Sequence, residues 1–478
     1  MSTRELVQGI DPQVIAVAHA VAKAGGRALI VGGFVRDRLL GLESKDHDLE
    51  VYGLELERLE RCLSEFGEVI AVGRAFGVLR VKGLEMDFSI PRRDSKTGRG
   101  HRGFLVELDP TLDFSEAARR RDLTVNSIGL DPLTAEVLDP HAGRTDLEQR
   151  RLRATDPEKF GEDSLRGLRV AQFLARFEMG VDEQLFELCR ALDLSDLPGE
   201  RMYDELNKLL LKAKRPSLGF EFLRETGLLR FFPELEAMVG VPQDPEWHPE
   251  GTVWEHTLMV VDQAAQDRRG DEDDLVLMLG ALCHDLGKPD TTVVVDGRVR
   301  SPLHEDVGVP IAEAFLGRLR ASTEITRKIA ALVDHHLAPA VYVKGGATAK
   351  AYRRLARKLA AVGLDPQMLF RVARADHFGR GTEDAIRREF PAGETFLERM
   401  DELDVEETGV RDVVLGRHLI GRGFQPSPWF GTVLAACRDV QDETGWTDPD
   451  RILEQGLLRT NAGETEGGVS DPDQGKNL

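Results

Sequence analysis

The sequence is poor in cysteine and has no long apolar run. Its four cysteines, Cys62, Cys189, Cys283 and Cys437, are scattered over 478 residues and form no pair with the spacing of a metal site. Such sparse use of cysteine suits a reducing cytoplasm, in which disulfides are rare. No apolar stretch is long enough to cross a bilayer, and the first residues lack the apolar core of a signal peptide. We therefore expect a cytoplasmic protein without a membrane partner.

Basic residues are also fewer than acidic residues, and the formal net charge is −20. This acidic average argues against nucleic-acid binding. Two clusters of arginine, at residues 119–121 and 150–153, oppose the average locally. Since a nucleic acid binds to a local basic patch and not to the mean charge of a protein, we give the clusters more weight.

The chain is too long for one hydrophobic core and has no internal repeat, so roughly two to four domains are expected. Periodicity and composition predict an α+β protein. Its regions are an α/β unit (1–150), a helical segment (151–240), a histidine-rich helical segment (241–390), a last helical segment (391–460) and a disordered tail (461–478). The segment 241–251, rich in proline and acidic residues, is interpreted as a boundary.

Within the first region, the patterns predict a mixture of helices and strands. Helical patterns cover Pro12–Ala24 and Leu54–Glu65, and extended patterns cover Glu68–Val72, Val78–Lys82 and Glu85–Ile90. The polar, glycine-bearing segment Arg92–Arg102 is predicted to be a mobile loop.

The stretch Leu29–Tyr52 begins with a pattern that suits phosphate binding. It reads LIVGGFVRDRLLGLESKDHDLEVY. Gly32 and Gly33 follow an apolar run, so the backbone there can approach a phosphate closely, and a following helix would point its N–H groups at the anion. Arg36 adds a charged donor.

The same stretch ends with a pattern that suits metal binding. Asp46 and Asp48 lie two residues apart in an extended run, so their side chains point to one face of a strand. Two convergent carboxylates can hold a divalent metal. Asp87, on a later predicted strand, is a candidate third carboxylate. The stretch therefore predicts a nucleotide phosphate held beside a carboxylate-bound metal.

A later predicted helix carries charged residues that could read a base. Asp163, Arg166 and Arg169 recur at three-residue steps, so we expect them on one side of that helix. A carboxylate beside a guanidinium offers one acceptor and a fork of donors, which can match the edge of a base. The alternative is a surface ion pair that contributes under about 1 kcal/mol.

Four ordered motifs resemble those of the bacterial tRNA nucleotidyltransferase and poly(A) polymerase family, which includes the CCA-adding enzymes of the eubacterial–eukaryotic class. They read GGFVRD, DHDLEVYG, RRRDLTVNSIGLD and GEDSLRGLRVAQF. The resemblance implies that residues 1–150 are a catalytic head and residues 151–240 a helical neck. It also implies that Asp46 and Asp48 are the catalytic residues, which bind Mg²⁺ and activate the 3′-hydroxyl of tRNA for attack on an α-phosphate.

The resemblance further implies a set of nucleotide contacts. They are Gly32, Gly33, Arg36, Asp37, Arg121, Asp122, Asn126, Asp163, Arg166 and Arg169. Asp163 and Arg166 would pair with the incoming C or A in place of a template. Gln172 departs from the family pattern, which commonly has a second arginine there, and Ser427 replaces a glycine of the closing segment. The preference between CTP and ATP therefore stays open.

Six of the twelve histidines fall within Trp254–Gly379, several of them beside acidic residues. Imidazole and carboxylate together suit first-row metals or Mg²⁺. The ordered set, with its LCHDLGKP stretch, resembles the HD phosphohydrolase superfamily. The resemblance implies a site for a divalent metal (Mg, Mn, Ni or Co), with Lys288 near the substrate phosphate. The implied ligands are His256, His284, Asp285, His304, His335 and Asp376.

Both resemblances together predict a tRNA nucleotidyltransferase that adds CCA from CTP and ATP by two-metal chemistry. The HD domain at 241–390 would add phosphatase and 2′,3′-cyclic phosphodiesterase activity, and residues 391–460 would contact tRNA. An A-adding enzyme or a poly(A) polymerase is the nearest alternative, because all three share these motifs. The alternative of another class is an RNA-binding protein in which only the HD hydrolase is active. The sequence leaves the oligomeric state open.

Overall fold

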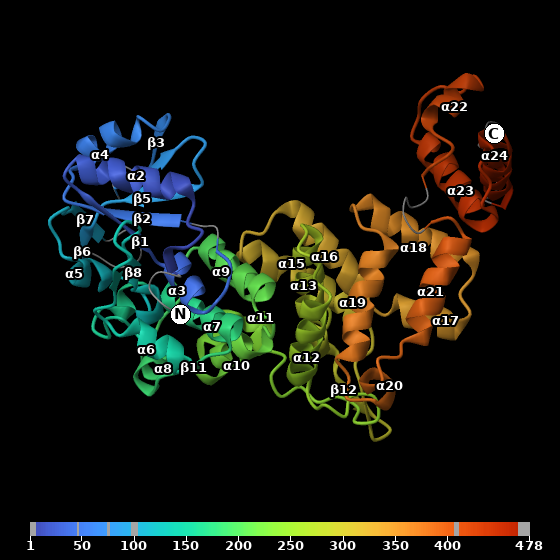
Figure 1. Ribbon diagram of the computed structural model, residues 1–478. Helices are drawn as coiled ribbons and strands as arrows, with labels where there is room; N and C mark the ends of the chain where they lie inside the picture. Colours follow the sequence, from blue (N-terminus) through green and yellow to red (C-terminus); the bar gives the residue numbers. More distant parts are fainter. Residues whose placement is uncertain (1–5, 45–46, 74–76, 97–103, 406–410, 467–478) are drawn as a thin grey trace, which may run out of the picture. The chain divides into compact units, whose positions relative to one another are not determined.

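The computed structural model forms two compact units, Met1–Glu236 and Ala237–Leu478 (Figure 1). The residues that it describes are 6–44, 47–73, 77–96, 104–405 and 411–466. Within these ranges, no helix is both long and apolar enough to cross a membrane. A seven-stranded sheet in the first unit, with helices through the rest of the chain, confirms the predicted α+β class.

The sheet of the first unit has the strand order β3-β4-β5-β2-β1-β8-β9. Its strands are β1 (Arg27–Val31), β2 (His47–Tyr52), β3 (Val69–Gly73), β4 (Val78–Val81), β5 (Met86–Ser89), β8 (Gly129–Leu130) and β9 (Val137–Leu138). β2 lies in the middle, antiparallel to β1 and parallel to β5. This pairing places Asp48 opposite Val31 on one side and beside Asp87 on the other. The predicted extended segments of this region are confirmed.

Short helices surround this sheet. Helix α2 (Pro12–Lys23) forms because its apolar residues recur at helical spacing and become buried, while the Asp11 side chain caps its first turn. Helix α3 (Gly33–Leu39) follows β1 directly, at Gly32, whose positive φ of 73° favours glycine. The remaining elements are α4 (Leu56–Leu63), α5 (Phe114–Ala118), the 3₁₀ turn η2 (Thr124–Asn126) and α6 (Gly143–Glu148).

One predicted loop of the head is a strand in part. Residues Arg92–Lys96 form β6, which pairs in antiparallel register with β7 (Phe104–Leu108). The prediction of a mobile loop is therefore wrong for these residues, because ladder hydrogen bonds to a distant partner outweigh the weak strand preference of a polar sequence. Residues 97–103 of the predicted loop lie outside the described ranges.

The rest of the first unit is mainly helical. Its elements are β10 (Arg151–Leu152), η3 (Phe160–Glu162), α7 (Leu165–Phe177), β11 (Gly180–Val181), α8 (Glu183–Arg190), α9 (Gly199–Lys212), α10 (Ser217–Glu225), η4 (Leu228–Phe231) and α11 (Pro233–Glu236). Helix α7 packs against α9 and α10. It begins at Leu165, so Asp163 precedes the helix and does not share its face with Arg166 and Arg169. The Asp163 carboxylate accepts the Leu165 N–H, a bond that favours a position before the first turn.

Over its described residues, the second unit consists of helices and a short hairpin. Its elements are α12 (Val253–Gln266), α13 (Asp273–Cys283), α14 (Lys288–Thr291), β12 (Val293–Val295), β13 (Arg298–Arg300), α15 (His304–Arg318), α16 (Thr323–His335), α17 (Ala338–Gly345), α18 (Ala349–Ala361), α19 (Pro366–Phe378), α20 (Glu383–Ile386), α21 (Pro391–Glu402), α22 (Gly416–Gly421), α23 (Trp429–Thr444) and α24 (Pro449–Glu466). Helices α12, α13, α16 and α19 pack together around the histidines.

The last described helix extends into the segment that composition predicts to be disordered. Helix α24 continues to Glu466, so the prediction is wrong for residues 461–466. Extending an existing helix costs little, because each added residue gains a hydrogen bond. The remainder of the predicted tail, residues 467–478, lies outside the described ranges.

Candidate functional site

The first candidate site lies where β1 ends and β2 begins. Asp48 is exposed on β2, and Asp87 lies beside it in register on β5. A Cβ atom on Gly32 would lie 3.3 Å from Arg121 Nη1 and 3.6 Å from Asp48 Oδ2. The glycine turn, a guanidinium and a carboxylate therefore meet at one place. Asp46 lies outside the described residues, and its role as a metal ligand stays a prediction.

A buried carboxylate that we did not single out in the sequence, Glu50, lies beneath this place. It is on the same face of β2 as Asp48, and its side chain is fully buried. Its oxygens lie 2.8 Å from Arg120 Nη2 and 3.6 Å from Arg121 Nη2, and one accepts a hydrogen bond from the Tyr52 hydroxyl. Burial alone would raise the pKa of Glu50, but Arg121 and Arg120 outweigh it and hold the pKa below its ordinary value. Glu50 is therefore charged and holds Arg121 near Gly32.

Replacement of Glu50 by Gln should weaken nucleotide binding more than it slows the chemical step. The amide keeps the shape of the side chain but loses the ion pairs with Arg120 and Arg121. A hydrogen bond to a charged group contributes about 1.5–3 kcal/mol, so we expect KM for the nucleotide to rise roughly tenfold or more. Steady-state kinetics measure the change, with the exposed Glu57→Gln as the control. An unchanged KM in a folded Glu50→Gln variant would contradict this role.

Several predicted nucleotide contacts form one internal polar network. Arg36 is buried, and its guanidinium donates to Asp37 Oδ1 at 2.8 Å and to Asn126 Oδ1 at 2.6 Å. The Asn126 amide donates to Asp122 Oδ1 at 3.0 Å, and Arg169 Nε donates to Asp122 Oδ2 at 2.6 Å. These bonds join α3, η2 and α7 behind the site. Direct contact of these five residues with a nucleotide stays a prediction.

The two predicted base-reading residues each have partners of their own. Asp163 Oδ2 lies 2.9 Å from Arg201 Nη2, on helix α9. The Arg166 guanidinium donates to the backbone carbonyls of Lys159 and Arg120, at 2.9 and 2.7 Å. A bound base would therefore have to share Asp163 and Arg166 with their present hydrogen-bonding partners or replace those partners. No sequence pattern that we used pointed to Arg201.

The arginine clusters that we interpreted as basic patches are partly neutralised inside the head. Arg119 lies 2.9 Å from the buried Asp156. Arg151 and Arg153 both pair with the buried Asp146, at 3.0 and 2.9 Å. Much of this positive charge therefore stabilises the fold, and its use in nucleic-acid binding stays a prediction.

The second candidate site is a cluster of imidazoles and carboxylates in the helical unit. Its members are His256 on α12, His284 and Asp285 just after α13, His304 at the start of α15, His336 just after α16, and Asp376 on α19. All of these side chains are buried. Two overlapping groups of three, His256–His284–Asp285 and Asp285–His304–His336, have donor atoms close enough to hold a metal ion.

Asp285 contributes one oxygen to each group. On one side, His284 Nε2 lies 3.1 Å from Asp285 Oδ2, and His256 Nε2 lies 3.4 Å from His284 Nε2 and 3.0 Å from Asp376 Oδ1. On the other side, His304 Nε2 lies 3.3 Å from both Asp285 Oδ1 and His336 Nε2. The carboxylate is thus placed to bridge two positions.

The opposite edge of each imidazole is anchored. The Nδ1 atoms of His284, His304 and His336 lie 2.8–2.9 Å from backbone carbonyls, and that of His256 lies 2.8 Å from Glu250 Oε1. Because these oxygens can only accept, each Nδ1 carries a proton and each Nε2 faces the cluster. Burial alone would lower the pKa of His256, but its hydrogen bonds to Asp376 and Glu250 outweigh burial and raise that pKa. Burial lowers the pKa of His336 to about 3, which keeps that ring neutral.

This donor set fits divalent metal ions. The Nε2 atoms of two pairs of rings lie 3.4 and 3.3 Å apart, which is close to the separation of two imidazole ligands about 2.1 Å from one tetrahedral ion. Both Asp285 oxygens are buried and accept no hydrogen bond of normal geometry from the described residues, although Lys288 Nζ lies 2.7 Å from Oδ2. Neutral imidazole and carboxylate are ligands of Zn²⁺, Mn²⁺, Ni²⁺ and Co²⁺ alike. The cluster is therefore a candidate metal centre.

The structure corrects one ligand of the predicted set. His335 turns away from the cluster, with its Nε2 3.0 Å from Asp334 Oδ2 and 3.4 Å from Lys358 Nζ. Its neighbour His336 takes the place beside Asp285 and His304. Successive residues at a helix end point about 100° apart, so only one of the two can face the cluster.

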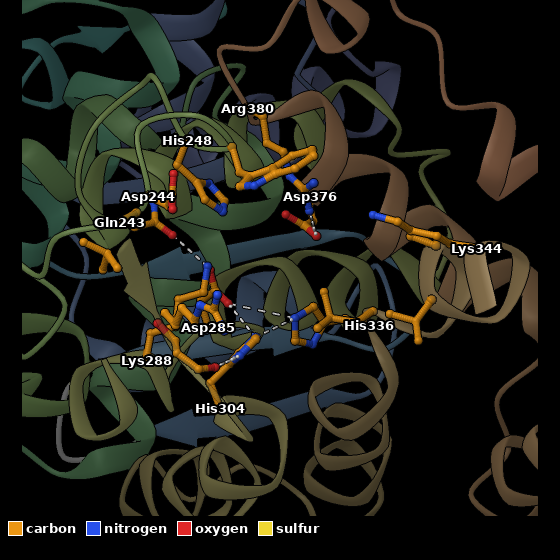
Figure 2. Close-up of a pocket in the computed structure, with 17 residues that line it drawn as sticks. Gln243, Asp244, His248, Asp285, Lys288, His304, His336, Lys344, Asp376 and Arg380 are labelled. Carbon is orange, nitrogen blue, oxygen red and sulfur yellow. Dashed lines mark hydrogen bonds and ion pairs between the residues drawn. The ribbon is translucent and has the colours of Figure 1, made fainter. Parts of the chain in front are cut away.

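A cavity of about 410 Å³ opens over this cluster. In Figure 2, Asp285, His304 and His336 converge on one side of the cavity, with Asp376 and Arg380 across from them. Lys288 Nζ also donates to Gln243 Oε1 at 2.7 Å, so this cation is fixed at the cavity wall. Further lining residues that we did not predict are Gln243, Asp244, Trp247, His248 and Arg380. Most come from the segment interpreted as a boundary, whose tryptophan and histidine are unusual for a linker and could have indicated a site.

Comparison with known proteins gives matches over most of the chain. Family models described as "Poly A polymerase head domain", "Probable RNA and SrmB- binding site of polymerase A" and "HD domain" match residues 28–153, 179–239 and 253–374. A relative named "Multifunctional CCA protein" from Alkalilimnicola ehrlichii is 38% identical over 320 residues, which is 65% of this chain and 74% of the relative. A relative of the same name from Actinobacillus pleuropneumoniae is 36% identical over 315 residues, with 64% and 74% covered.

Solved structures share the fold. The Bacillus stearothermophilus CCA-adding enzyme in complex with CTP has a TM-score of 0.65 and 20% identity, with 96% of this chain and 100% of that chain covered. The Thermotoga maritima CCA-adding enzyme complexed with tRNA has a TM-score of 0.57 and 17% identity, with 96% and 98% covered.

The head fold, the neck and the histidine–aspartate cluster together define a nucleotidyltransferase with an HD domain. The chain belongs to the bacterial tRNA nucleotidyltransferase and poly(A) polymerase family, alongside the multifunctional CCA proteins.

Proposed function

We propose that this protein adds C and A residues to the 3′ end of tRNA, with CTP and ATP as the donors. The observation that carries the proposal is the meeting of Asp48, Gly32 and Arg121 in the head, beside Asp87 on the neighbouring strand. The names of the relatives support CCA addition over other uses of the same head.

In this proposal, Asp46 and Asp48 hold Mg²⁺, which would neutralise triphosphate charge and favour ionisation of the tRNA 3′-hydroxyl. Arg121 lies where it can bind a triphosphate oxygen, and Glu50 keeps its guanidinium oriented. The positive φ of Gly32 lets the backbone turn without a side chain between Asp48 and Arg121. Asp163 and Arg166 would read the base after exchanging their present partners.

The HD domain is proposed to be a second, hydrolytic site for phosphate esters. His256, His284, Asp285, His304, His336 and Asp376 would hold divalent metal ions, which supply an activated water and polarise a phosphoryl oxygen. Lys288 and Arg380 line the cavity and can bind the remaining phosphate oxygens.

An incorporation assay with single nucleotides tests the first activity. A tRNA that ends at its discriminator base should gain C residues with CTP alone, nothing with ATP alone, and a complete CCA end with both. We expect this order because the neck side chains that select the base would respond to the 3′ end of the bound tRNA. Denaturing gels with labelled nucleotides measure the products. Incorporation of A alone would favour an A-adding enzyme, and long A tracts would favour a poly(A) polymerase.

A further inference from the structure

A second cavity of the helical unit lies apart from the one over the candidate metal centre. It has a volume of about 350 Å³ and is formed by the end of α16, by α17 and by one side of α18. Its lining residues are His335, Tyr342, Thr348, Lys350, Ala351, Arg354, Leu355 and Lys358. The two cavities share no lining residue. A volume of this size lies within the range of small-molecule sites, which is roughly 300–1,000 Å³.

The side chains that line this second cavity give it a positive charge. Lys350, Arg354 and Lys358 are spaced four residues apart, so they lie along one side of α18. No carboxylate is among the described residues that line the cavity. Charges of one sign around a cleft reinforce each other, so the cavity would attract an anion. The chain as a whole, by contrast, has a net charge of −20.

Two of these cations have carboxylate partners on α23, outside the cavity lining. Arg354 Nη2 lies 2.5 Å from Asp439 Oδ1, and Lys350 Nζ lies 2.6 Å from Glu443 Oε1. Glu443 also pairs with Arg459, at 2.5 Å, so it would keep a cation if Lys350 turned to a ligand. All of these side chains are partly exposed, and ion pairs at a surface are weak. Binding of an anion can therefore compete with them.

The third cation, Lys358, has looser contacts. Its Nζ lies 3.9 Å from Asp334 Oδ2 and 3.4 Å from His335 Nε2. The first distance is too long for a hydrogen bond. The ammonium group has three N–H donors, and the side chain is 64% exposed. Lys358 is therefore placed to donate to a ligand in the cavity.

The donors around the cavity match an anion with several charges and many acceptor oxygens. Each ammonium offers three N–H donors and the guanidinium offers five, and the hydroxyls of Tyr342 and Thr348 can also donate. Phosphate groups are common partners of both kinds of cation. A diphosphate or triphosphate suits three cations better than a single carboxylate does. The candidate metal-binding groups of the described chain include no residue of this cavity, so the cavity fits binding and not metal-assisted hydrolysis.

We propose that this cavity binds a small anion with a diphosphate or triphosphate group, either inorganic pyrophosphate or a nucleoside triphosphate. The cavity adjoins the candidate metal centre, because His335 lines the cavity and the next residue, His336, belongs to the centre. A bound anion would therefore contact the end of the helix that positions a candidate metal ligand. The assignment concerns binding and does not rest on either proposed activity.

Protection of lysine side chains from acetylation tests the site residue by residue. The full-length protein is treated with N-hydroxysuccinimidyl acetate, without added metal ions, in the presence or absence of saturating pyrophosphate. Mass spectrometry measures the acetylation of Lys350 and Lys358. We expect pyrophosphate to slow both reactions at least about threefold, because the bound anion covers the ammonium groups and keeps them charged. Lys23, exposed at the end of α2, is the internal control and should react at an unchanged rate.

The variant Arg354→Gln should remove most of this protection at Lys350 and Lys358. The glutamine remains polar but lacks the charge in the middle of the row. The matched control is Arg387→Gln, which removes a positive charge outside the cavity and should leave protection unchanged. The two arginine side chains are similarly exposed, at 55% and 58%. Circular dichroism checks the fold, and if Arg354→Gln does not fold, Lys358→Gln replaces it with Lys350 as the reporter.

A parallel series with ATP distinguishes the two sources of the phosphate group. Protection by ATP at lower concentrations than by pyrophosphate would support a nucleotide site, and equal or weaker protection by ATP would support a pyrophosphate site. No protection by either anion would overturn the proposal, as would full protection in a folded Arg354→Gln variant. Protection by a tRNA transcript but by neither small anion would also overturn it and would favour an RNA-binding surface.

Discussion

Asp48→Ala should abolish nucleotide addition, with a loss of at least about 10³-fold in kcat/KM. The carboxylate is exposed on β2, beside Asp87 and the Gly32 turn. Removal of one preorganised charge at a transition state commonly costs about 10²–10³-fold, and loss of a metal ligand should cost at least as much. Because Asp48 is exposed, its truncation should leave the fold intact. Incorporation of labelled CTP into tRNA measures the loss.

The same variant should keep the HD activity. Hydrolysis of bis(p-nitrophenyl) phosphate provides the readout, and circular dichroism checks the fold. Asp46→Ala is expected to behave in the same way. Loss of both activities in a folded Asp48→Ala variant would contradict the assignment of nucleotide addition to the first unit and of hydrolysis to the second.

Asp285→Asn should produce the reverse pattern. One oxygen of Asp285 faces His284 and the other faces His304, so the neutral amide weakens both halves of the candidate metal centre. It also replaces one acceptor with an NH₂ group that would face an imidazole or Lys288. We expect phosphodiester hydrolysis to fall at least about 10³-fold, with nucleotide addition within about twofold of normal.

The neighbouring pair His335 and His336 supplies a matched control for this prediction. His336→Ala should reduce hydrolysis strongly, because His336 Nε2 lies 3.3 Å from His304 Nε2 in the cluster. His335→Ala should have little effect, because that ring contacts Asp334 and Lys358 outside the cluster. Similar losses in the two variants would show that the cluster is assembled differently in solution.

Much of the fold is predictable from local patterns. Val14, Val17, Ala18 and Val21 recur at helical spacing, and all of them are buried on α2. The strand that carries Asp48 is likewise evident from its alternation. Local patterns fail where a distant partner decides the conformation. Arg92–Lys96 is polar and contains no strand signal of its own, yet it pairs with β7 along its whole length.

The candidate sites show the same limit. The HD dyad His284-Asp285 is visible in the sequence because the two ligands are adjacent. The choice between His335 and His336 depends on the direction of a helix end, which spacing does not reveal. Glu50 and Glu250 are single acidic residues whose importance arises only from arginines and histidines brought to them by the fold. A pattern of residue types cannot indicate such roles without the three-dimensional arrangement.

The anchoring of the HD imidazoles also bears on how the site tolerates mutation. His284, His304 and His336 are each oriented by the carbonyl three residues earlier, from Ala281, Ser301 and Val333. A carbonyl belongs to the main chain, so substitution of those three residues by most others would leave the anchor in place. The orientation of His256 depends instead on a side chain that a single nucleotide change can remove. Mutation of an anchoring residue should therefore leave the orientation of three imidazoles intact, whereas mutation of Glu250 should disturb the orientation of His256.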